Sequence, residues 1–238
     1  MDFSVTEEKK QPMGACIKVI GVGGGGGNAV DSMVDSPEMA SVTFIVANTD
    51  AQALAISRVP HRVQLGEKIT KGLGAGSNPE VGRRSAEEDL EVVRELIKGA
   101  DILFLTGGMG GGTGSGALPV IAQAARELGI LTVAVVTKPF TFEGKRRMIH
   151  AEEAIRLLKQ SVDTLLVVPN QKLLENVEST ISMLDAFALS NSVLKQAIQG
   201  ISDIITKSGH INVDFADVRS IMKDMGLAIM GIGRKSGE

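Results

Sequence analysis

Five short apolar runs, separated by segments with helical periodicity, constrain the fold of this chain more than any other feature. The runs are continuous rather than alternating, as expected for parallel strands covered on both faces. They span residues 17–22, 42–47, 102–106, 131–137 and 165–168. Amphipathic segments lie between them, most clearly at 79–98, which Asn78 can cap, and at 115–128. This alternation predicts an α/β fold with a doubly wound, mostly parallel sheet, on which ligands bind outside the carboxyl ends of the strands.

The composition bears on three properties: nucleic-acid binding, the redox compartment and membrane insertion. Lysine and arginine total 25 against 28 aspartates and glutamates, a net charge of -3, so we expect no nucleic-acid partner. A single cysteine, Cys16, cannot form an internal disulfide, which fits a reducing compartment. No apolar run approaches the ~18 residues of a membrane span, and the polar amino terminus does not look like a signal sequence. We therefore expect a cytoplasmic protein without direct membrane insertion.

The pattern changes after residue 179. One long helical period covers residues 180–208, although Gly200 interrupts it and costs about 1 kcal/mol. A loop (209–214), a short helix (215–225) and an apolar strand (227–232) follow. This last strand has no visible partner, so we interpret 209–238 as a loop and the truncated start of a second domain. The other expected units are a disordered lead-in (1–14), a ligand-binding domain (15–179) and a central helix (180–208).

The strongest chemical signal is TGGMGGGTGSGALP, which directly follows one predicted strand and begins a helix. Its seven glycines allow backbone N–H groups to turn toward an anion, and the helix amino terminus adds its positive dipole end. Thr113 and Ser115 can donate hydroxyl hydrogen bonds to phosphate oxygens. A merely flexible turn is the alternative, but glycines and hydroxyls at a strand–helix junction favour a phosphate site.

A second glycine loop, residues 23–27, follows the first predicted strand and precedes Asn28. A dinucleotide fingerprint can be traced in it, but the second strand ends in Ala47, Asn48 and Thr49 rather than in an acidic residue, and Asp50 comes just beyond. Neither loop contains the lysine of a P-loop. Two phosphate loops without that lysine predict a nucleoside triphosphate held mainly by backbone amides.

The segment GGGTGSG (residues 110–116) resembles the signature of the tubulin-like family of GTPases. Five further segments are similar to the bacterial cell-division members of that family: IKVIGVGGGGGNAV (17–30), NTDAQAL (48–54), KGLGAGSNPEVGR (71–83), VTKPFTFEGKRR (136–147) and NVDFADVR (212–219). The resemblance covers residues 16–238. It implies a GTP/GDP-binding GTPase that uses Mg²⁺ and polymerises head to tail at the mid-cell division site. Other division proteins would bind a carboxyl-terminal tail that this chain lacks.

The resemblance also implies a nucleotide site. Asp50 and Ala75 match loops near the γ-phosphate, where phosphates and water largely hold Mg²⁺; a helix N-cap is the alternative role for Asp50. Glu143 and Arg147 match positions that contact the ribose and base, and their alternative is a solvated charge pair. The remaining residues implied for phosphates and nucleoside are Gly24, Gly25, Gly26, Gly27, Asn28, Gly111, Gly112, Thr113, Gly114, Ser115 and Asn170.

Guanine selection has a physical rationale on the long helix. Phe187 and Asn191 are four residues apart and therefore share a helix face. One side chain can stack on the base while the carboxamide oxygen of the other accepts from the N1–H and N2–H donors of guanine. The alternative is that Phe187 belongs to the core and Asn191 is solvated.

Asn212, Asp214 and Asp217 form the third group of interest. In isolation, two carboxylates at a loop–helix junction are most often an N-cap and a surface charge. However, about 21 helical residues separate Phe187 from Ser208, a rise of ~30 Å, so these aspartates would lie far from a base bound at Phe187. In the family they enter the site of the next subunit and polarise the water that attacks the γ-phosphate. Such a head-to-tail contact propagates as an open filament.

Two other functions remain as alternatives. As a truncated chain, the protein could be a GTP-binding module that caps filaments or fails to elongate them. An oxidoreductase with a dinucleotide site would instead bind NAD(H), and the missing acidic residue after the second strand argues against it.

Overall fold

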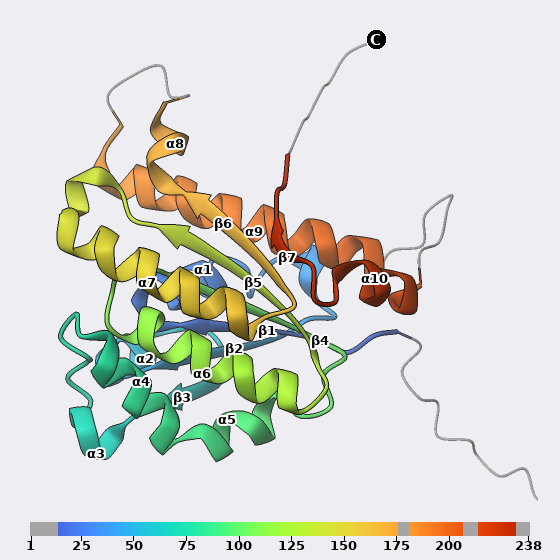
Figure 1. The fold of residues 1–238 in the computed structure, drawn as a ribbon, viewed down its shortest axis with the longest axis horizontal. Coiled ribbons are helices and arrows are strands. Elements are labelled where there is room, and N and C mark those ends of the chain that lie inside the picture. The colour runs from blue at the N-terminus through green and yellow to red at the C-terminus, as the bar shows by residue number, and fades with distance from the viewer. Residues whose placement is uncertain (1–13, 176–180, 207–213, 232–238) are drawn as a thin grey trace, which may run out of the picture.

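The computed structural model describes residues 14–175, 181–206 and 214–231, and these form one seven-stranded sheet (Figure 1). The strand order is β3-β2-β1-β4-β5-β6-β7, and every neighbouring pair is parallel. The predicted doubly wound α/β fold is therefore confirmed. The strands are β1 (Ile17–Val22), β2 (Thr43–Asn48), β3 (His61–Gln64), β4 (Ile102–Gly108), β5 (Leu131–Lys138), β6 (Thr164–Pro169) and β7 (Gly226–Ala228).

Helices cover both faces of the sheet, and this explains why the strand sequences are continuously apolar. On β1, Ile20 and Val22 pack into one apolar cluster, whereas Ile17 and Val19 pack into the other. The first cluster includes residues of α4 (Pro79–Glu88), α5 (Leu90–Ile97), α6 (Thr113–Glu127) and α7 (Lys145–Ser161). The second includes residues of α1 (Gly23–Asp31), η1 (Pro37–Met39), α2 (Ala51–Ile56) and α9 (Met183–Thr206). The short helices are α3 (Glu67–Thr70), η2 (Thr141–Glu143), α8 (Asn170–Leu174) and α10 (Phe215–Met222).

The segment predicted as one helix over 79–98 is two helices that meet at Asp89. The backbone of Asp89 leaves the helical region (φ -108°, ψ 20°). Its carboxylate accepts a hydrogen bond from the N–H of Gly66 at 2.6 Å. A short acidic side chain with a strong partner outside the helix interrupts the helical backbone here. The sequence also gave no sign of β3, because Val63 is its one buried residue.

The carboxyl-terminal strand does have a partner, contrary to the expectation from sequence. β7 pairs in parallel with β6, so that Leu227 lies opposite Leu165 and the sheet gains an edge strand. The pairing joins residues more than 60 positions apart, and this contact leaves no local signal. The helix before it ends at Met222 rather than near residue 225. The lead-in through residue 13, Gly209 and the far end of the chain lie outside the described residues, and the division into domains stays a prediction.

No helix in the described ranges combines the length and apolarity required to cross a bilayer.

Candidate functional site

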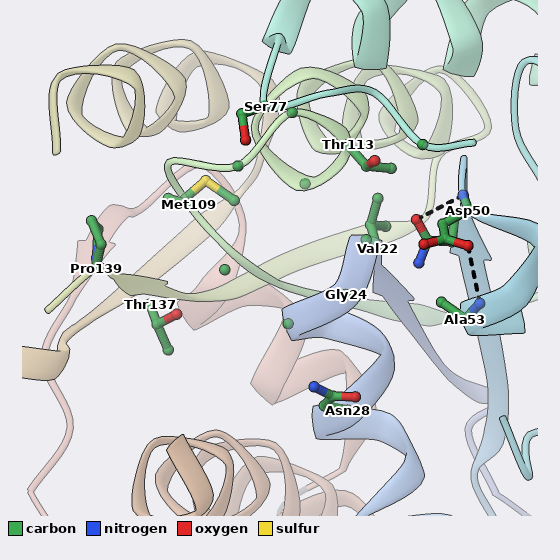
Figure 2. Close-up of a pocket in the computed structure, with 18 of the residues that line it drawn as sticks. Val22, Gly24, Asn28, Asp50, Ala53, Ser77, Met109, Thr113, Thr137 and Pro139 are labelled. Atoms are coloured by element: carbon green, nitrogen blue, oxygen red, sulfur yellow. Dashed lines mark hydrogen bonds between the residues drawn. The ribbon is translucent and has the colours of Figure 1, made fainter. Parts of the chain in front are cut away.

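A cavity of about 580 Å³ opens at the carboxyl ends of the central strands. Its walls come from the segments that follow β1, β2 and β4, from the loop that contains Leu73 and Ser77, from the η2–α7 region and from α9. Figure 2 shows Gly24 and Asn28 on α1, Asp50 after β2 and Thr113 at the beginning of α6 around this space. The strand order of this parallel sheet reverses between β1 and β4, because β2 and β3 lie on one side of β1 and β4 to β7 on the other. Such a switch point is where doubly wound sheets bind ligands.

The two glycine-rich segments meet at this point. α1 begins at Gly23 and α6 begins at Thr113, so both helix amino termini adjoin the cavity. A Cβ added to Gly23 would lie 3.0 Å from the nitrogen of Gly114, and one added to Gly25 would lie 3.1 Å from the nitrogen of Gly108. The backbones therefore approach each other too closely for most side chains. Two helix amino termini held side by side concentrate N–H donors suited to an anion.

The glycines of this region have two different roles. A Cβ on Gly112 would lie 2.8 Å from the Cβ of Ala75, and one on Gly26 would lie 2.5 Å from the oxygen of Thr106, so these glycines allow close packing. By contrast, a Cβ on Gly24 or Gly111 would meet nothing within 4 Å, although both residues line the cavity. Their missing side chains leave open space beside the backbone, where a ligand can approach.

The structure brings most of the predicted nucleotide residues together. Those that line the cavity are Gly24, Gly25, Asn28, Asp50, Gly111, Gly112, Thr113, Gly114, Glu143, Arg147, Asn170, Phe187 and Asn191. Four do not line it: Gly26, Gly27, Ala75 and Ser115. The hydroxyl of buried Ser115 accepts a hydrogen bond from the N–H of Gly110 at 2.8 Å, so this side chain supports the loop.

Asp50 has the N-cap role considered for it and also lines the cavity. Its Oδ1 accepts hydrogen bonds from the N–H groups of Gln52 (2.9 Å) and Ala53 (3.2 Å), which makes it the N-cap of α2. It also lines the cavity (Figure 2). In the described part of the chain, Oδ2 of Asp50 has no hydrogen-bond partner and is therefore available to a ligand.

Sequence reasoning missed one wall of the cavity. Leu73, Gly74, Gly76 and Ser77 all line it. Three of them have left-handed backbones, with φ of 86° at Gly74, 57° at Gly76 and 59° at Ser77. Such values are unusual for serine, and residues in this region often mark functional loops. The clustered glycines of KGLGAGSN were the available signal. Thr49, Thr137 and Ser190 were also missed.

Glu143, the last residue of η2, and Arg147, in the first turn of α7, form an ion pair. Arg147 donates to Oε2 of Glu143 at 2.7 Å, and Oε1 of Glu143 accepts from the N–H of Phe140 at 2.8 Å. The Glu143 side chain is 11% exposed, against 47% for Arg147. The carboxylate is therefore fixed in the cavity wall, whereas the guanidinium remains accessible to solvent.

An aromatic cluster borders the same side of the cavity. The rings of Phe140 and Phe142 are stacked at 4.9 Å, and Phe187 meets Phe140 edge-on at 5.3 Å. Phe187 is 37% exposed, so it is not a core residue, and Asn191 lines the cavity one turn further along α9. Neighbouring Ser190 donates to the carboxamide oxygen of buried Asn170 at 2.8 Å. This side of the cavity offers an apolar ring edge next to carboxamides.

The charges of the cavity wall do not favour an anion. The charged residues that line it are Asp50, Glu143 and Arg147, and Arg147 is already paired with Glu143. An anion bound here must therefore be held by backbone N–H groups, hydroxyls and helix termini. No group of three or more His, Cys, Asp or Glu within the described ranges is arranged to hold a metal ion.

Asp214 and Asp217 lie far from the cavity. Asp214 is the N-cap of α10, and its Oδ1 accepts from the N–H of Asp217 at 2.8 Å. Neither residue lines the cavity, and Figure 1 shows α10 at the end of α9 remote from the carboxyl ends of the central strands. The N-cap considered from the sequence is thus present. Asn212 lies outside the described residues.

Comparisons with known proteins agree with this geometry. The model of the Tubulin/FtsZ family GTPase domain matches residues 16–178. The cell division protein FtsZ of Buchnera aphidicola subsp. Acyrthosiphon pisum (strain APS) is 58% identical over 224 residues, which are 94% of this chain and 58% of that protein. The chain therefore spans less than two thirds of the length of this relative.

Solved structures similar to the chain include an FtsZ and a CetZ. An empty FtsZ dimer from M. jannaschii has a TM-score of 0.87 at 43% identity, over 91% of this chain and 63% of that one. The GDP-bound monomer of CetZ1 from Haloferax volcanii has a TM-score of 0.75 at 25% identity, over 89% of this chain and 65% of that one.

Proposed function

Because the chain belongs to the Tubulin/FtsZ family through its GTPase domain, we propose that it binds GTP in the cavity and hydrolyses it to GDP and phosphate. The observation that carries the proposal is the meeting of the α1 and α6 amino termini beside open space at Gly24 and Gly111. Backbone donors at a helix amino terminus suit phosphate groups. The related CetZ1 was solved with GDP bound, which supports a guanine nucleotide as the ligand.

The rest of the cavity suits the other parts of the nucleotide. The amides at Gly24, Gly111 and Gly114 would hold the phosphates. Phe187 would contact the base, while the Asn191 carboxamide oxygen would accept from the guanine edge. Glu143, fixed by Phe140 and Arg147, would contact the ribose.

Mg²⁺ would accompany the triphosphate and neutralise charge that develops during phosphoryl transfer. The donor set fits an ion held mainly by phosphates and water, because the described residues of the wall offer one carboxylate oxygen without a partner, on Asp50, and no complete ligand cage. Asp50 would orient the hydrated ion near the terminal phosphate.

We assign hydrolysis to a contact between subunits. Asp214, Asp217 and Asn212 would position the attacking water on the nucleotide of the next subunit, since the described pair lies far from its own cavity. A contact between opposite ends of identical subunits is heterologous and extends as a filament. The related FtsZ dimer shows that one family member self-associates. The setting proposed is cytoplasmic assembly at the division site, together with other division proteins.

The proposal is tested by GTP binding and by phosphate release per subunit over a range of protein concentrations with Mg²⁺. A site completed by a neighbour predicts turnover per subunit that rises steeply with concentration. Constant turnover per subunit down to high dilution would contradict shared catalysis, and failure to bind GTP would contradict the whole proposal. GTP binding without turnover at any concentration would support the alternative, a GTP-binding module that caps filaments or fails to elongate them.

A further inference from the structure

The two loops at the phosphate end of the cavity are joined by a pair of buried hydroxyls. Thr49, directly after β2, and Thr113, the first residue of α6, have their Oγ1 atoms 2.7 Å apart. Thr49 is fully buried and Thr113 is 9% exposed. This contact connects two segments that are 64 residues apart in the sequence.

The direction of this hydrogen bond follows from the surroundings. Each hydroxyl has one hydrogen to donate. Among the described residues, Thr113 is the one hydrogen-bond partner of the Thr49 hydroxyl, which solvent does not reach. If Thr113 were the donor, the hydrogen of Thr49 would be buried without an acceptor, an unfavourable state. If Thr49 is the donor, the hydrogen of Thr113 remains free for the cavity that Thr113 lines.

The position of Thr49 is itself fixed. Its carbonyl oxygen accepts from the N–H of Gly74 at 3.1 Å and from the hydroxyl of Thr70 at 3.3 Å. Gly74 belongs to the loop whose residues Gly74, Gly76 and Ser77 have left-handed backbones and line the cavity. Thr49 is therefore held between this loop and Thr113.

We infer that Thr49 is a positioning residue that donates to Thr113 and thereby keeps the Thr113 hydroxyl hydrogen directed at a phosphate group of the bound nucleotide. This inference rests on the proposed function, because it takes the ligand of the cavity to be a guanine nucleotide. Thr49 acts through Thr113, because its one hydroxyl hydrogen is used in the contact between them. An anion gains a preoriented donor, and no reorientation is needed when it binds.

A double-mutant cycle with GDP, measured by calorimetry, tests the inference without interference from hydrolysis. Thr49→Val removes the donor at nearly constant shape and is expected to weaken GDP binding about tenfold, the effect of losing one hydrogen bond to a charged group. Thr49→Ser retains the hydroxyl and is expected to bind within about twofold of the original chain. Thr113→Val is expected to weaken binding at least as much as Thr49→Val. In the Thr113→Val background, Thr49→Val should add less than about twofold, because the two residues act as one unit.

Guanosine is the control ligand, since it has no phosphate and its affinity should be the same for Thr49→Val and the original chain. GDP binding by Thr49→Val equal to that of the original chain would overturn the inference, as would additive losses in the cycle or an equal loss for guanosine. If Thr49→Val does not fold, Thr49→Cys replaces it, and its weaker S–H donor should give a smaller loss with the same non-additivity. If the original chain binds neither GDP nor GTP, the proposed function fails, which is a different result from additive losses in a chain that binds.

Discussion

The two ends of the molecule are built in different ways. At the carboxyl ends of the strands, loops interlock so closely that a Cβ on Gly112 would contact both Ala75 and Asn78. At the other end, Val218 is the one buried residue of α10, and Phe215 and Met222 pack partly buried against the core. Arg219 adds a 2.9 Å hydrogen bond to the Gly129 carbonyl oxygen. The first arrangement suits a preformed ligand site. The second presents Asp214 and Asp217 on the surface, where another molecule can reach them.

The largest expected effect is a loss of GTP turnover without a loss of GTP affinity. Asp217→Asn should reduce GTP turnover about 100-fold or more, as removal of a group that activates the attacking water does. GTP affinity should stay within about twofold, because Asp217 does not line the cavity and a change remote from the ligand leaves its contacts intact. The N-cap side chain belongs to Asp214 and is unaffected. Phosphate release and nucleotide titration on the same protein check both statements, and a parallel loss of affinity would refute the separation of the two ends.

A packing glycine gives the next largest effect. Gly112→Ala places a carbon 2.8 Å from the Cβ of Ala75 and 2.9 Å from the nitrogen of Asn78. Overpacking of this kind costs about 2 kcal/mol of unfolding free energy. Urea denaturation without nucleotide measures it. Unchanged stability would show that the loops are less tightly interlocked than the structure indicates.

Gly111→Ala is the matched control at the neighbouring position. Its Cβ meets nothing within 4 Å, so stability should change by less than about 0.5 kcal/mol. GTP affinity should fall about tenfold, because the added carbon occupies space beside the backbone donors. Nucleotide titration checks the affinity. The account would be wrong here if Gly111→Ala bound GTP like the original chain.

The smallest expected effect concerns salt. Among the described residues, no unpaired basic side chain lines the cavity, so GTP affinity at fixed Mg²⁺ should change less than about threefold between low and moderate salt. Titrations over a salt series measure it. A steep loss of affinity would point to basic residues outside the described part of the chain.

The strands could be predicted because their burial on both faces makes them continuously apolar, as at Ile102 and Leu103, which lie in opposite clusters. The glycine loops identified the phosphate end for a similar reason, since a close approach of backbones demands glycine. Contacts between distant segments could not be predicted. The pairing of β7 with β6, the Asp89–Gly66 hydrogen bond and the Thr49–Thr113 pair depend on tertiary structure alone.

Some residues of the candidate site could be predicted from the sequence, and others could not. Asp50, Phe187 and Asn191 were identified by motif resemblance and by helical spacing, and the structure places all three at one cavity. Ser77 lies in a segment that matched the motif, but its left-handed backbone could not be read from the sequence, because it follows from the path of the whole loop. Ala75 matched the motif, but it is buried and packs against Gly112 instead of lining the cavity.

Mixing two inactive variants tests the separation of the two ends most directly. Asp214→Asn keeps an N-cap side chain and the nucleotide cavity but removes the carboxylate at the far end. Gly111→Ala keeps both aspartates. Its cavity stays mostly empty when the GTP concentration is below the dissociation constant of this variant. Each variant alone should release little phosphate, and an equal mixture should recover up to about a quarter of the original turnover, the share of randomly formed contacts that pair an intact cavity with intact aspartates. If the original chain turns over GTP but no mixing ratio of the two variants restores turnover, the site is not shared between neighbours.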